Sequence, residues 1–297
     1  MLTQLSPSQF PLAQPLFHSL AQHQPMCTAV LAGVYPGKIF VDDPAHPQSA
    51  LLTTHIGDES SGTWGFLAGN PANDAFNRAL NHAIFARQVV PPDSSILMLT
   101  CDPEGWGGHL PIVFSPRPPV SVPRYHFVSR KLTYDWRATL PTGFTVEPLT
   151  ADLLAHPNLA LPEDIRDTLQ KWHIQRTNKP TNQPLPDFGF LTLDQTGEVP
   201  IISSWATVDF VANGMGDLGF FTQPAYRRKS LGTIAAAAAI EHGLNHGLSQ
   251  VNWTCDAENE GSFHTAGKLG LEKMEDYKMV LLLMEEKRHR KLVEELG

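Results

Sequence analysis

The most regular pattern of apolar and polar positions in this chain runs from residue 188 to residue 284. Runs of β-branched and aromatic residues, separated by short turn sequences, predict three antiparallel strands, and an alanine-rich stretch then predicts a helix. The predicted elements are strands at 188–193, 200–211 and 215–222, a helix at 230–246, a strand at 250–255, a helix at 258–268 and a strand at 277–284. This order predicts an α/β (α+β) fold, with helices flanking a mixed, mostly antiparallel sheet.

The first half of the chain has a fainter version of the same order. Its predicted elements are a helix at 15–24, strands at 27–34, 38–41, 50–56 and 63–68, a helix at 73–88 and a strand at 95–100. A proline-rich segment at 111–123 is typical of a domain junction. We therefore predict an N-terminal domain of residues 1–130 and a C-terminal domain of residues 131–297, and the pattern leaves open whether the two are duplicates.

Composition and charge narrow the class of protein. Hydrophobic residues make up 42% and charged residues 18% of the 297 positions, which is typical of a globular protein. The net charge of -8 disfavours nucleic acid as a partner. We expect no membrane partner, because the chain has neither a signal-like N-terminus nor a long apolar run. Three widely spaced cysteines favour a reducing compartment, so a cytoplasmic location is expected.

The basic run Arg227, Arg228 and Lys229 lies between a predicted strand and the N-terminus of the alanine-rich helix. A helix N-terminus offers unpaired N–H groups and a partial positive charge, and both suit it to binding a phosphate. Taken alone, the run also fits a solvated turn. The sequence thus makes this loop a candidate anion site.

The segment 226–232 resembles the pyrophosphate loop of the GNAT acetyltransferase family, whose pattern is Gln/Arg-x-x-Gly-x-Gly/Ala. Arg227 fills the first position and Gly232 the last, whereas Ser230 stands where the family usually has its middle glycine. The segment 259–271 resembles the family's next helix, which begins near a CoA-proximal asparagine, here Asn259, and ends in a Leu-Gly corner. The resemblance covers roughly residues 140–284. Asn259 also fits a simple helix cap.

Membership of this family would imply an N-acetyltransferase that moves an acyl group from acetyl-CoA to a primary amine by direct attack, without a metal. The implied partner is a small-molecule amine or amino terminus, and the implied state is a monomer or a homodimer. The CoA-binding residues implied by the resemblance are Phe220, Phe221, Thr222, Arg227, Arg228, Lys229, Ser230, Leu231, Gly232, Thr233, Asn259 and Ser262.

For catalysis, we predict Asp217 as the base, since it shares a strand face with Gly219 and Phe221 and similar proteins place a carboxylate there. An exposed edge carboxylate is the alternative reading, and Asp209 and Glu241 are weaker candidates. The family's acid is a tyrosine, but that position is Ala266 here. Ser262 lies one helical turn earlier, so Ser262 or water is our candidate proton donor, and His264 is expected to point elsewhere.

The N-terminal half is similar to the extra domain of one GNAT branch, at Gly37, Asp42, Asp43, Pro47 and 66–69. Its turn at 69–72 is too short and uncharged to hold a pyrophosphate, so we predict a degenerate GNAT-like domain with a structural or substrate-shaping role. A CoA-binding sensor without catalysis remains the rival function, because Ser230 and Ala266 both depart from the family pattern. The acceptor pocket is expected in variable segments such as 162–186, and the sequence does not identify the acceptor.

Overall fold

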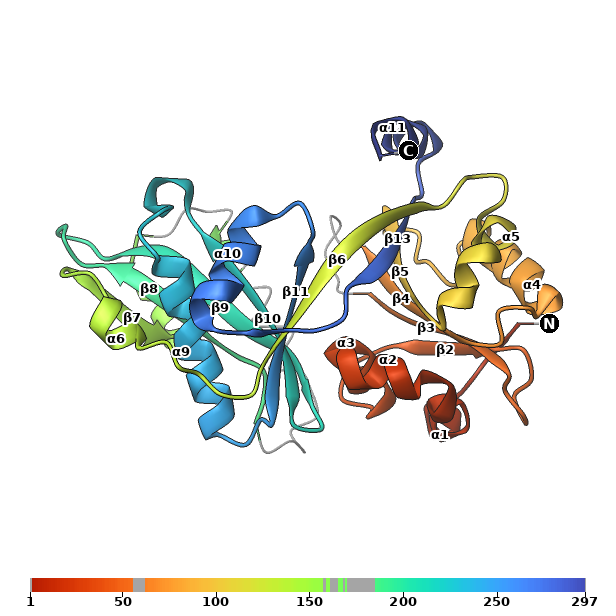
Figure 1. Cartoon of the computed structure of the whole chain (residues 1–297), viewed down its shortest axis with the longest axis horizontal. Helices are drawn as coiled ribbons and strands as arrows, with labels where there is room; N and C mark the ends of the chain where they lie inside the picture. Colours follow the sequence, from red (N-terminus) through yellow and green to blue (C-terminus); the bar gives the residue numbers. More distant parts are fainter. Residues whose placement is uncertain are drawn as a thin grey trace. The chain divides into compact units, whose positions relative to one another are not determined.

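The computed structural model describes residues 2–55, 62–156, 159–160, 165–167, 169 and 185–296. The chain forms two compact units (Figure 1). The first unit contains Met1–Arg124 together with Asp276–Gly297, and the second unit contains Tyr125–Glu275. Most of the segment 162–186, where we expected part of an acceptor pocket, lies outside the described residues.

The second unit contains the order predicted for the region from residue 188. Strands β7 to β10 pair antiparallel in sequence order, helix α9 follows, and strand β11 pairs parallel to β10. Its elements are α6 (Trp136–Thr139), β7 (Phe144–Pro148), α7 (Ala151–Leu154), β8 (Phe188–Asp194), β9 (Ile201–Ala212), β10 (Met215–Thr222), η4 (Pro224–Tyr226), α9 (Leu231–Asn245), β11 (Gln250–Asp256), α10 (Glu260–Leu269) and β12 (Glu272–Lys273).

The first unit repeats this order: antiparallel strands β2 to β4, helix α4, and strand β5 parallel to β4. Its elements are β1 (Thr3–Gln4), η1 (Pro7–Gln9), α1 (Phe10–Ala13), η2 (Gln14–Phe17), α2 (His18–His23), α3 (Pro25–Leu31), β2 (Lys38–Val41), β3 (Ser49–His55), β4 (Thr63–Gly69), α4 (Asp74–Phe85), β5 (Ile96–Asp102), η3 (Glu104–Gly108), α5 (Leu110–Phe114), β13 (Tyr277–Leu283) and α11 (Glu286–Leu296). The two units thus share an order of antiparallel strands, a helix and a parallel strand.

The last strand and the proline-rich junction differ from our expectation. β13, expected at the end of the C-terminal domain, pairs antiparallel with β5 in the first unit. The expected junction ends in strand β6 (Val120–Ser129), whose first half pairs with β13 and whose second half pairs with β12. The unit division therefore falls at residues 124/125, within this strand, and again at 275/276.

The prediction of a strand at 27–34 is wrong, because residues 25–31 form helix α3. Six of the seven residues of α3 are buried. Its apolar run therefore has no one-sided pattern that would distinguish a helix from a strand. Pro25 occupies the first turn of the helix, where its missing N–H group costs nothing.

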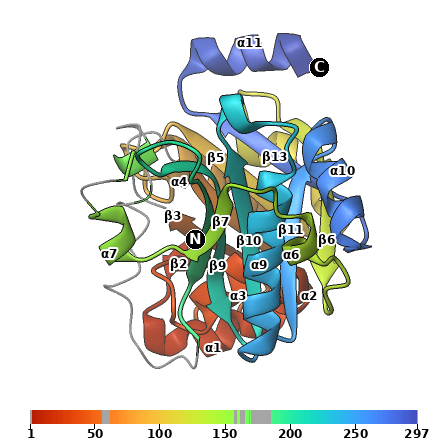
Figure 2. The ribbon, with the colours of Figure 1, turned by 90° about the vertical axis from the view of Figure 1, so that its left-hand side faces the viewer.

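The core of the second unit lies between α9 and the sheet, where α9 packs on β8, β9 and β10 (Figure 2). Ala235 to Ala239 are all at most 3% exposed. Their short side chains allow the helix axis to lie close to the strands, because little volume separates the two backbones. This close packing fixes the N-terminus of α9 against the end of β10, where the candidate site lies.

Candidate functional site

The site begins where two parallel strands separate. β10 and β11 pair from Met215↔Gln250 to Asp217↔Asn252, and among the described residues no pairing continues beyond that point. β10 nevertheless extends to Thr222 and β11 to Asp256. The strands thus diverge, and the β11-facing edge of β10 has backbone groups available to a ligand.

An irregularity in the neighbouring strand lies beside this divergence. The register of β9 against β10 shifts between Met215 and Asp217, and Phe210 on β9 has φ +55°. A bulge of this kind bends a strand and changes the direction of the side chains that follow. It lies next to the last paired residues of β10 and β11, at the point where the gap opens.

The loop from β10 to α9 has an unusual backbone for its sequence. Arg228 and Ser230 have φ values of +67° and +61°, which is the left-handed region that few non-glycine residues adopt. Ser230 is the N-cap of α9, and its backbone carbonyl accepts a helical hydrogen bond from Ile234 N at 3.0 Å. The preceding first-turn N–H groups lack intrahelical acceptors, so the loop and helix end present an anion-binding concavity.

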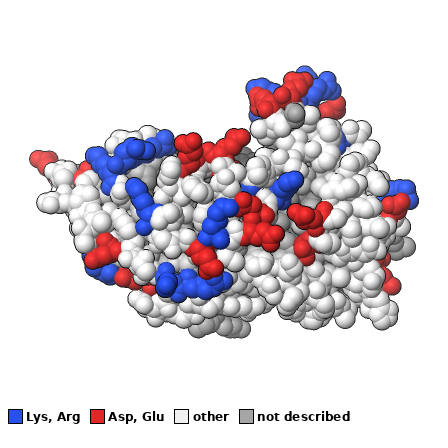
Figure 3. All heavy atoms as spheres, viewed as in Figure 1, with Lys and Arg blue, Asp and Glu red and all other residues white. Residues whose placement is uncertain are grey.

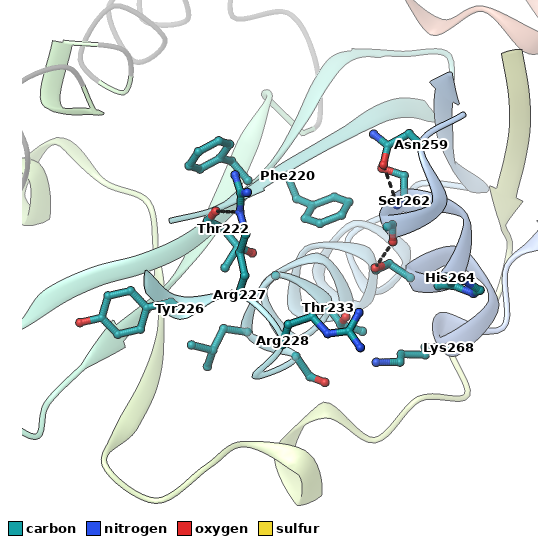
Figure 4. Close-up of a pocket in the computed structure, with 16 residues that line it drawn as sticks. Phe220, Thr222, Tyr226, Arg227, Arg228, Thr233, Asn259, Ser262, His264 and Lys268 are labelled. Atoms are coloured by element: carbon teal, nitrogen blue, oxygen red, sulfur yellow. Dashed lines mark hydrogen bonds between the residues drawn. The ribbon is translucent and has the colours of Figure 1, made fainter. Parts of the chain in front are cut away.

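This concavity forms part of a pocket of about 720 Å³ (Figure 4). Eleven of the twelve residues predicted to bind CoA line it, and the exception is Lys229, whose Nζ lies 5.4 Å from the centroid of the Tyr226 ring. The lining residues are Phe220, Phe221, Thr222, Tyr226, Arg227, Arg228, Ser230, Leu231, Gly232, Thr233, Asn259, Gly261, Ser262, His264, Thr265 and Lys268. Among these described residues are three permanent cations and no carboxylate, so the pocket favours an anion.

Sequence reasoning missed one group of lining residues on α10. Gly261, Thr265 and Lys268 are spaced by four and three positions, which places them on one face of a helix. That periodicity, together with the positive charge of Lys268, was a usable signal. His264, which we expected to point elsewhere, also belongs to the lining.

Gly232 has a steric role in addition to its place in the loop. A Cβ atom at this position would contact Thr222 Oγ1 and come within 2.9 Å of Phe220 Cδ2. Real Cβ atoms do not approach other atoms this closely, so a side chain at this position would require Thr222, Phe220 or the helix itself to shift. The glycine therefore permits the close approach that shapes the pocket.

Tyr226 at the pocket edge is held by a carboxylate. Its hydroxyl donates to Asp194 Oδ2 at 3.0 Å, and burial followed by this bond raises the pKa of Tyr226. Hydrogen bonds from Thr196, and to a lesser degree from Tyr226, lower the pKa of Asp194. At neutral pH the tyrosine is thus a fixed neutral wall of the pocket.

The structure brings two of the three candidate bases together, outside the pocket lining. Asp217 lies directly opposite Asp209 of β9 and beside Asn252 of β11. Thr207 Oγ1 donates to Asp209 Oδ2 at 2.9 Å. Asp217 is one of the last paired residues before the strands diverge, so it lies next to the gap.

Comparison with known proteins settles the family. The family model described as GNAT acetyltransferase matches residues 14–280. The chain belongs to this family. No curated protein matches the chain significantly.

Solved GNAT structures share the fold over nearly the whole chain. A GCN5-related N-acetyltransferase-like protein from Streptococcus suis has 22% identity and a TM-score of 0.60, covering 92% of this chain and 98% of its own. A tandem GNAT protein from the clavulanic acid biosynthesis pathway has 12% identity and a TM-score of 0.62, covering 96% and 98%. A GCN5-related N-acetyltransferase from Sphaerobacter thermophilus has 11% identity and a TM-score of 0.62, covering 96% of each chain.

The third candidate base of this GNAT protein is engaged elsewhere. Glu241 on α9 forms an ion pair with Arg137 at 2.8 Å and accepts a hydrogen bond from Trp136 Nε1 at 3.2 Å. The Arg137 hydrogen bond lowers the pKa of Glu241 below its usual range. Glu241 does not line the pocket, and its two carboxylate oxygens accept hydrogen bonds from Arg137 and Trp136.

We expect Glu241→Gln to lower the free energy of unfolding at pH 7 by less than about 1 kcal/mol, because the Arg137 and Glu241 side chains are 63% and 33% exposed and solvent weakens their attraction. A lowered folded-state pKa stabilises the protein above the unfolded-state pKa, and this contribution is lost as pH falls through the folded value. The difference from wild type should therefore disappear in acid. Urea unfolding at several pH values measures it, and a difference that grows toward acid would contradict the assignment.

Ser230 stands where the family usually has its middle glycine. A left-handed backbone costs a non-glycine residue about 1–2 kcal/mol, which exceeds the extra unfolded-state entropy of glycine. Ser230→Gly should thus raise the free energy of unfolding by up to about 1 kcal/mol, measured by urea denaturation. Ser121→Gly, at an exposed position of β6, is the control and should destabilise. Equal losses in both variants would contradict strain at Ser230.

Helix α10 carries Ala266 at the position where the family has a tyrosine. Ala266 is 0% exposed and packs in the core with Ala235 and Trp253, so a tyrosine there would require repacking. Asn259 Oδ1 accepts from Ser262 N at 3.0 Å, so Asn259 caps the helix and also lines the pocket. Ser262 is in the lining, one turn before Ala266 (Figure 4).

The N-terminal residues singled out from the sequence hold local turns. Asp42 accepts hydrogen bonds from Gln48 N at 2.9 Å and from Asn73 Nδ2 at 2.7 Å. Gly69 has φ +89°, and a Cβ atom there would contact Gln48 O. The loop 70–73 between β4 and α4 contains no basic residue. These observations support a structural role for this part of the first unit.

Four further features of the described residues bear on what the sequence led us to expect. In the parts of the chain that the structure describes, no group of three or more His, Cys, Asp or Glu residues could hold a metal ion, and none of the helices there has the length and apolarity needed to cross a membrane. Cys27, Cys101 and Cys255 are free thiols. On the face shown in Figure 3, Lys and Arg form small groups interspersed with Asp and Glu.

Proposed function

We propose that this protein is an N-acetyltransferase that transfers an acetyl or related acyl group from acetyl-CoA to a primary amine. The observation that carries the proposal is the pocket at the divergence of β10 and β11. It combines the N-terminus of a 15-residue helix, two left-handed loop residues and three lining cations. These are the features that a diphosphate requires of a protein site.

Different groups of described residues would hold different parts of CoA. First-turn amides of α9, with Arg227 and Arg228, would hold the pyrophosphate, and Lys268 adds charge from α10. The unpaired edge of β10 beyond Asp217 would accept the amide groups of the pantetheine arm as an added strand. Gly232 keeps the space between α9 and β10 that this arrangement requires.

In the proposed reaction, Asp217 takes a proton from the ammonium group of the acceptor. The neutral nitrogen attacks the thioester carbonyl carbon, so that a C–N bond forms as the C–S bond breaks. The electron pair of the C–S bond leaves with sulfur. The nitrogen loses its second proton as the amide forms, and this proton reaches the thiolate through water or through the Ser262 hydroxyl, which is reprotonated in the same transfer. Because a thiol has a reference pKa of about 8.5, its thiolate leaves readily without the tyrosine that Ala266 replaces.

We also propose that the protein works in the reducing cytoplasm, on a small-molecule amine or an amino terminus, as a monomer or homodimer. The free thiols favour this compartment. Burial raises the pKa of Cys101 to about 12, with a smaller effect of Asp102, so this thiol stays neutral.

A CoA-binding sensor without catalysis is the second candidate. The strained backbone at Ser230 and the buried alanine at position 266 favour it. Both functions predict CoA binding, and only the transferase predicts turnover.

The experiment is a free-thiol release assay with acetyl-CoA and a panel of primary amines, run with thermal unfolding in millimolar CoA. We expect both thermal stabilisation and thiol release that depends on the amine. Stabilisation without thiol release for any amine would favour the sensor. A protein that CoA does not stabilise would contradict both candidates.

A further inference from the structure

The sheet face that carries Asp217 differs from the face that carries α9. Leu218 and Val208 belong to the core under α9, and side chains alternate along a strand. Residues 217, 219 and 221 of β10 therefore project from the opposite face. Their partners on β9 project with them, giving three register pairs. We call this set the acceptor face: Asp217–Asp209, Gly219–Thr207 and Phe221–Trp205.

One end of the acceptor face is aromatic and accessible. The rings of Trp205 and Phe221 lie 4.8 Å apart with an interplanar angle of 31°. Phe221 is 40% exposed and also lines the pocket that we assign to CoA. An exposed ring and a half-buried ring beside a ligand pocket offer apolar area for a second ligand.

The middle of the acceptor face is open. Gly219 is exposed, and a Cβ atom built on it would meet only Thr207 Oγ1, at 3.7 Å. The Thr207 hydroxyl donates to Asp209. A ligand can thus lie across Gly219 between the two ends without displacing a described side chain.

The other end of the acceptor face is acidic. Asp217 and Asp209 stand directly opposite each other, and like charges in this position repel. An ammonium group of a ligand placed beside both carboxylates would be attracted by each of them. Two carboxylates side by side therefore favour an ammonium group over a neutral or anionic ligand.

A buried amide beside the acidic end points to the same ligand site. Asn252 is the register partner of Asp217 on β11, so its side chain lies on the same face. It is 0% exposed, its Oδ1 lies 3.1 Å from His126 Nε2, and its Nδ2 has no hydrogen-bond partner among the described residues. A buried unpaired donor is costly. An oxygen acceptor carried by the reactants would satisfy it.

The distance between the acidic and aromatic ends of the acceptor face limits the length of the ligand. Asp217 and Phe221 are four residues apart, and a strand rises about 3.4 Å per residue. After allowance for a hydrogen bond at the carboxylates and a van der Waals contact at the rings, roughly 7 Å remains for the ligand. That length matches an aromatic ring joined to an ammonium group by two carbons.

We propose that the acceptor face binds an arylalkylamine, with its ammonium group at Asp217 and Asp209 and its ring on Trp205 and Phe221. This inference rests on the proposed function, because it makes this amine the acceptor. The aromatic end argues against a polyamine, which would need further carboxylates along the face.

The test is calorimetric titration of the full-length protein, saturated with CoA, with 2-phenylethylamine, ethylamine and spermidine. We expect 2-phenylethylamine to bind at least about tenfold more tightly than ethylamine, because it buries a ring as well as the ammonium group. Trp205→Ala should reduce this ratio by about tenfold. The control Phe263→Ala removes an aromatic side chain that is also 40% exposed, on α10, and should leave the ratio unchanged.

Thiol release with the same amines separates this inference from the proposed function. Ring-dependent binding without thiol release for any amine would overturn the transferase and leave the amine site standing. Thiol release that shows no preference for 2-phenylethylamine, or spermidine as the tightest ligand, would overturn the arylalkylamine site while the transferase stands. Equal ratios in wild type and Trp205→Ala would also overturn it.

Discussion

Gly232→Asp is expected to abolish the thermal stabilisation that CoA gives to the wild-type protein. At a CoA concentration about 100 times its dissociation constant, the wild type should gain about 2.7 kcal/mol, or roughly 5–10 °C in unfolding temperature. The aspartate would place a negative charge beside the phosphate groups, and its Cβ atom would meet Thr222 and Phe220. Differential scanning fluorimetry with and without CoA measures the shift.

The steric part of this effect needs its own control. Gly232→Ala introduces the same Cβ contact without the charge, so its loss of CoA stabilisation should be partial. Both variants must show a cooperative unfolding transition without CoA, which establishes that each folds. A Gly232→Asp protein that folds and keeps the full wild-type shift would refute the assignment of the phosphate site to this loop.

Asp217→Asn is expected to lower kcat for acyl transfer by about a hundredfold or more near neutral pH, because it removes the proposed base while conserving volume. The stabilisation by CoA should stay at its wild-type value, since Asp217 does not line the pocket. Steady-state thiol release measures the first quantity and thermal unfolding the second.

Asp209→Asn is the matched control, because Asp209 faces Asp217 across the strand pair. It should weaken amine binding more than it lowers kcat. If Asp209→Asn shows the hundredfold loss in kcat and Asp217→Asn does not, the base is Asp209. If neither variant changes kcat, neither carboxylate serves as the base and the proton moves by another route.

The sequence was most informative where chemistry and structure are local. Arg227, Ser230 and Gly232 lie within one short segment, and a strand, a loop and a helix that are contiguous in sequence must meet in space. Local signals such as strand alternation and the alanine run therefore located β10, the loop and α9. The periodicity of α10 also carried information that we did not use, at Gly261, Thr265 and Lys268.

The tertiary structure alone decided which distant segments pair and which side chains are enclosed. β13 completes the first unit, and β10 separates from β11 after Asp217, because strand partners are chosen by long-range hydrogen bonding and packing. For the same reason the sequence did not show that Asp209 opposes Asp217, that Glu241 is held by Arg137, or that Ala266 is buried. The chain by itself determined the loop before α9 and the helix that follows it, since those depend on neighbours in sequence, whereas the surroundings of each catalytic candidate depend on residues many positions away.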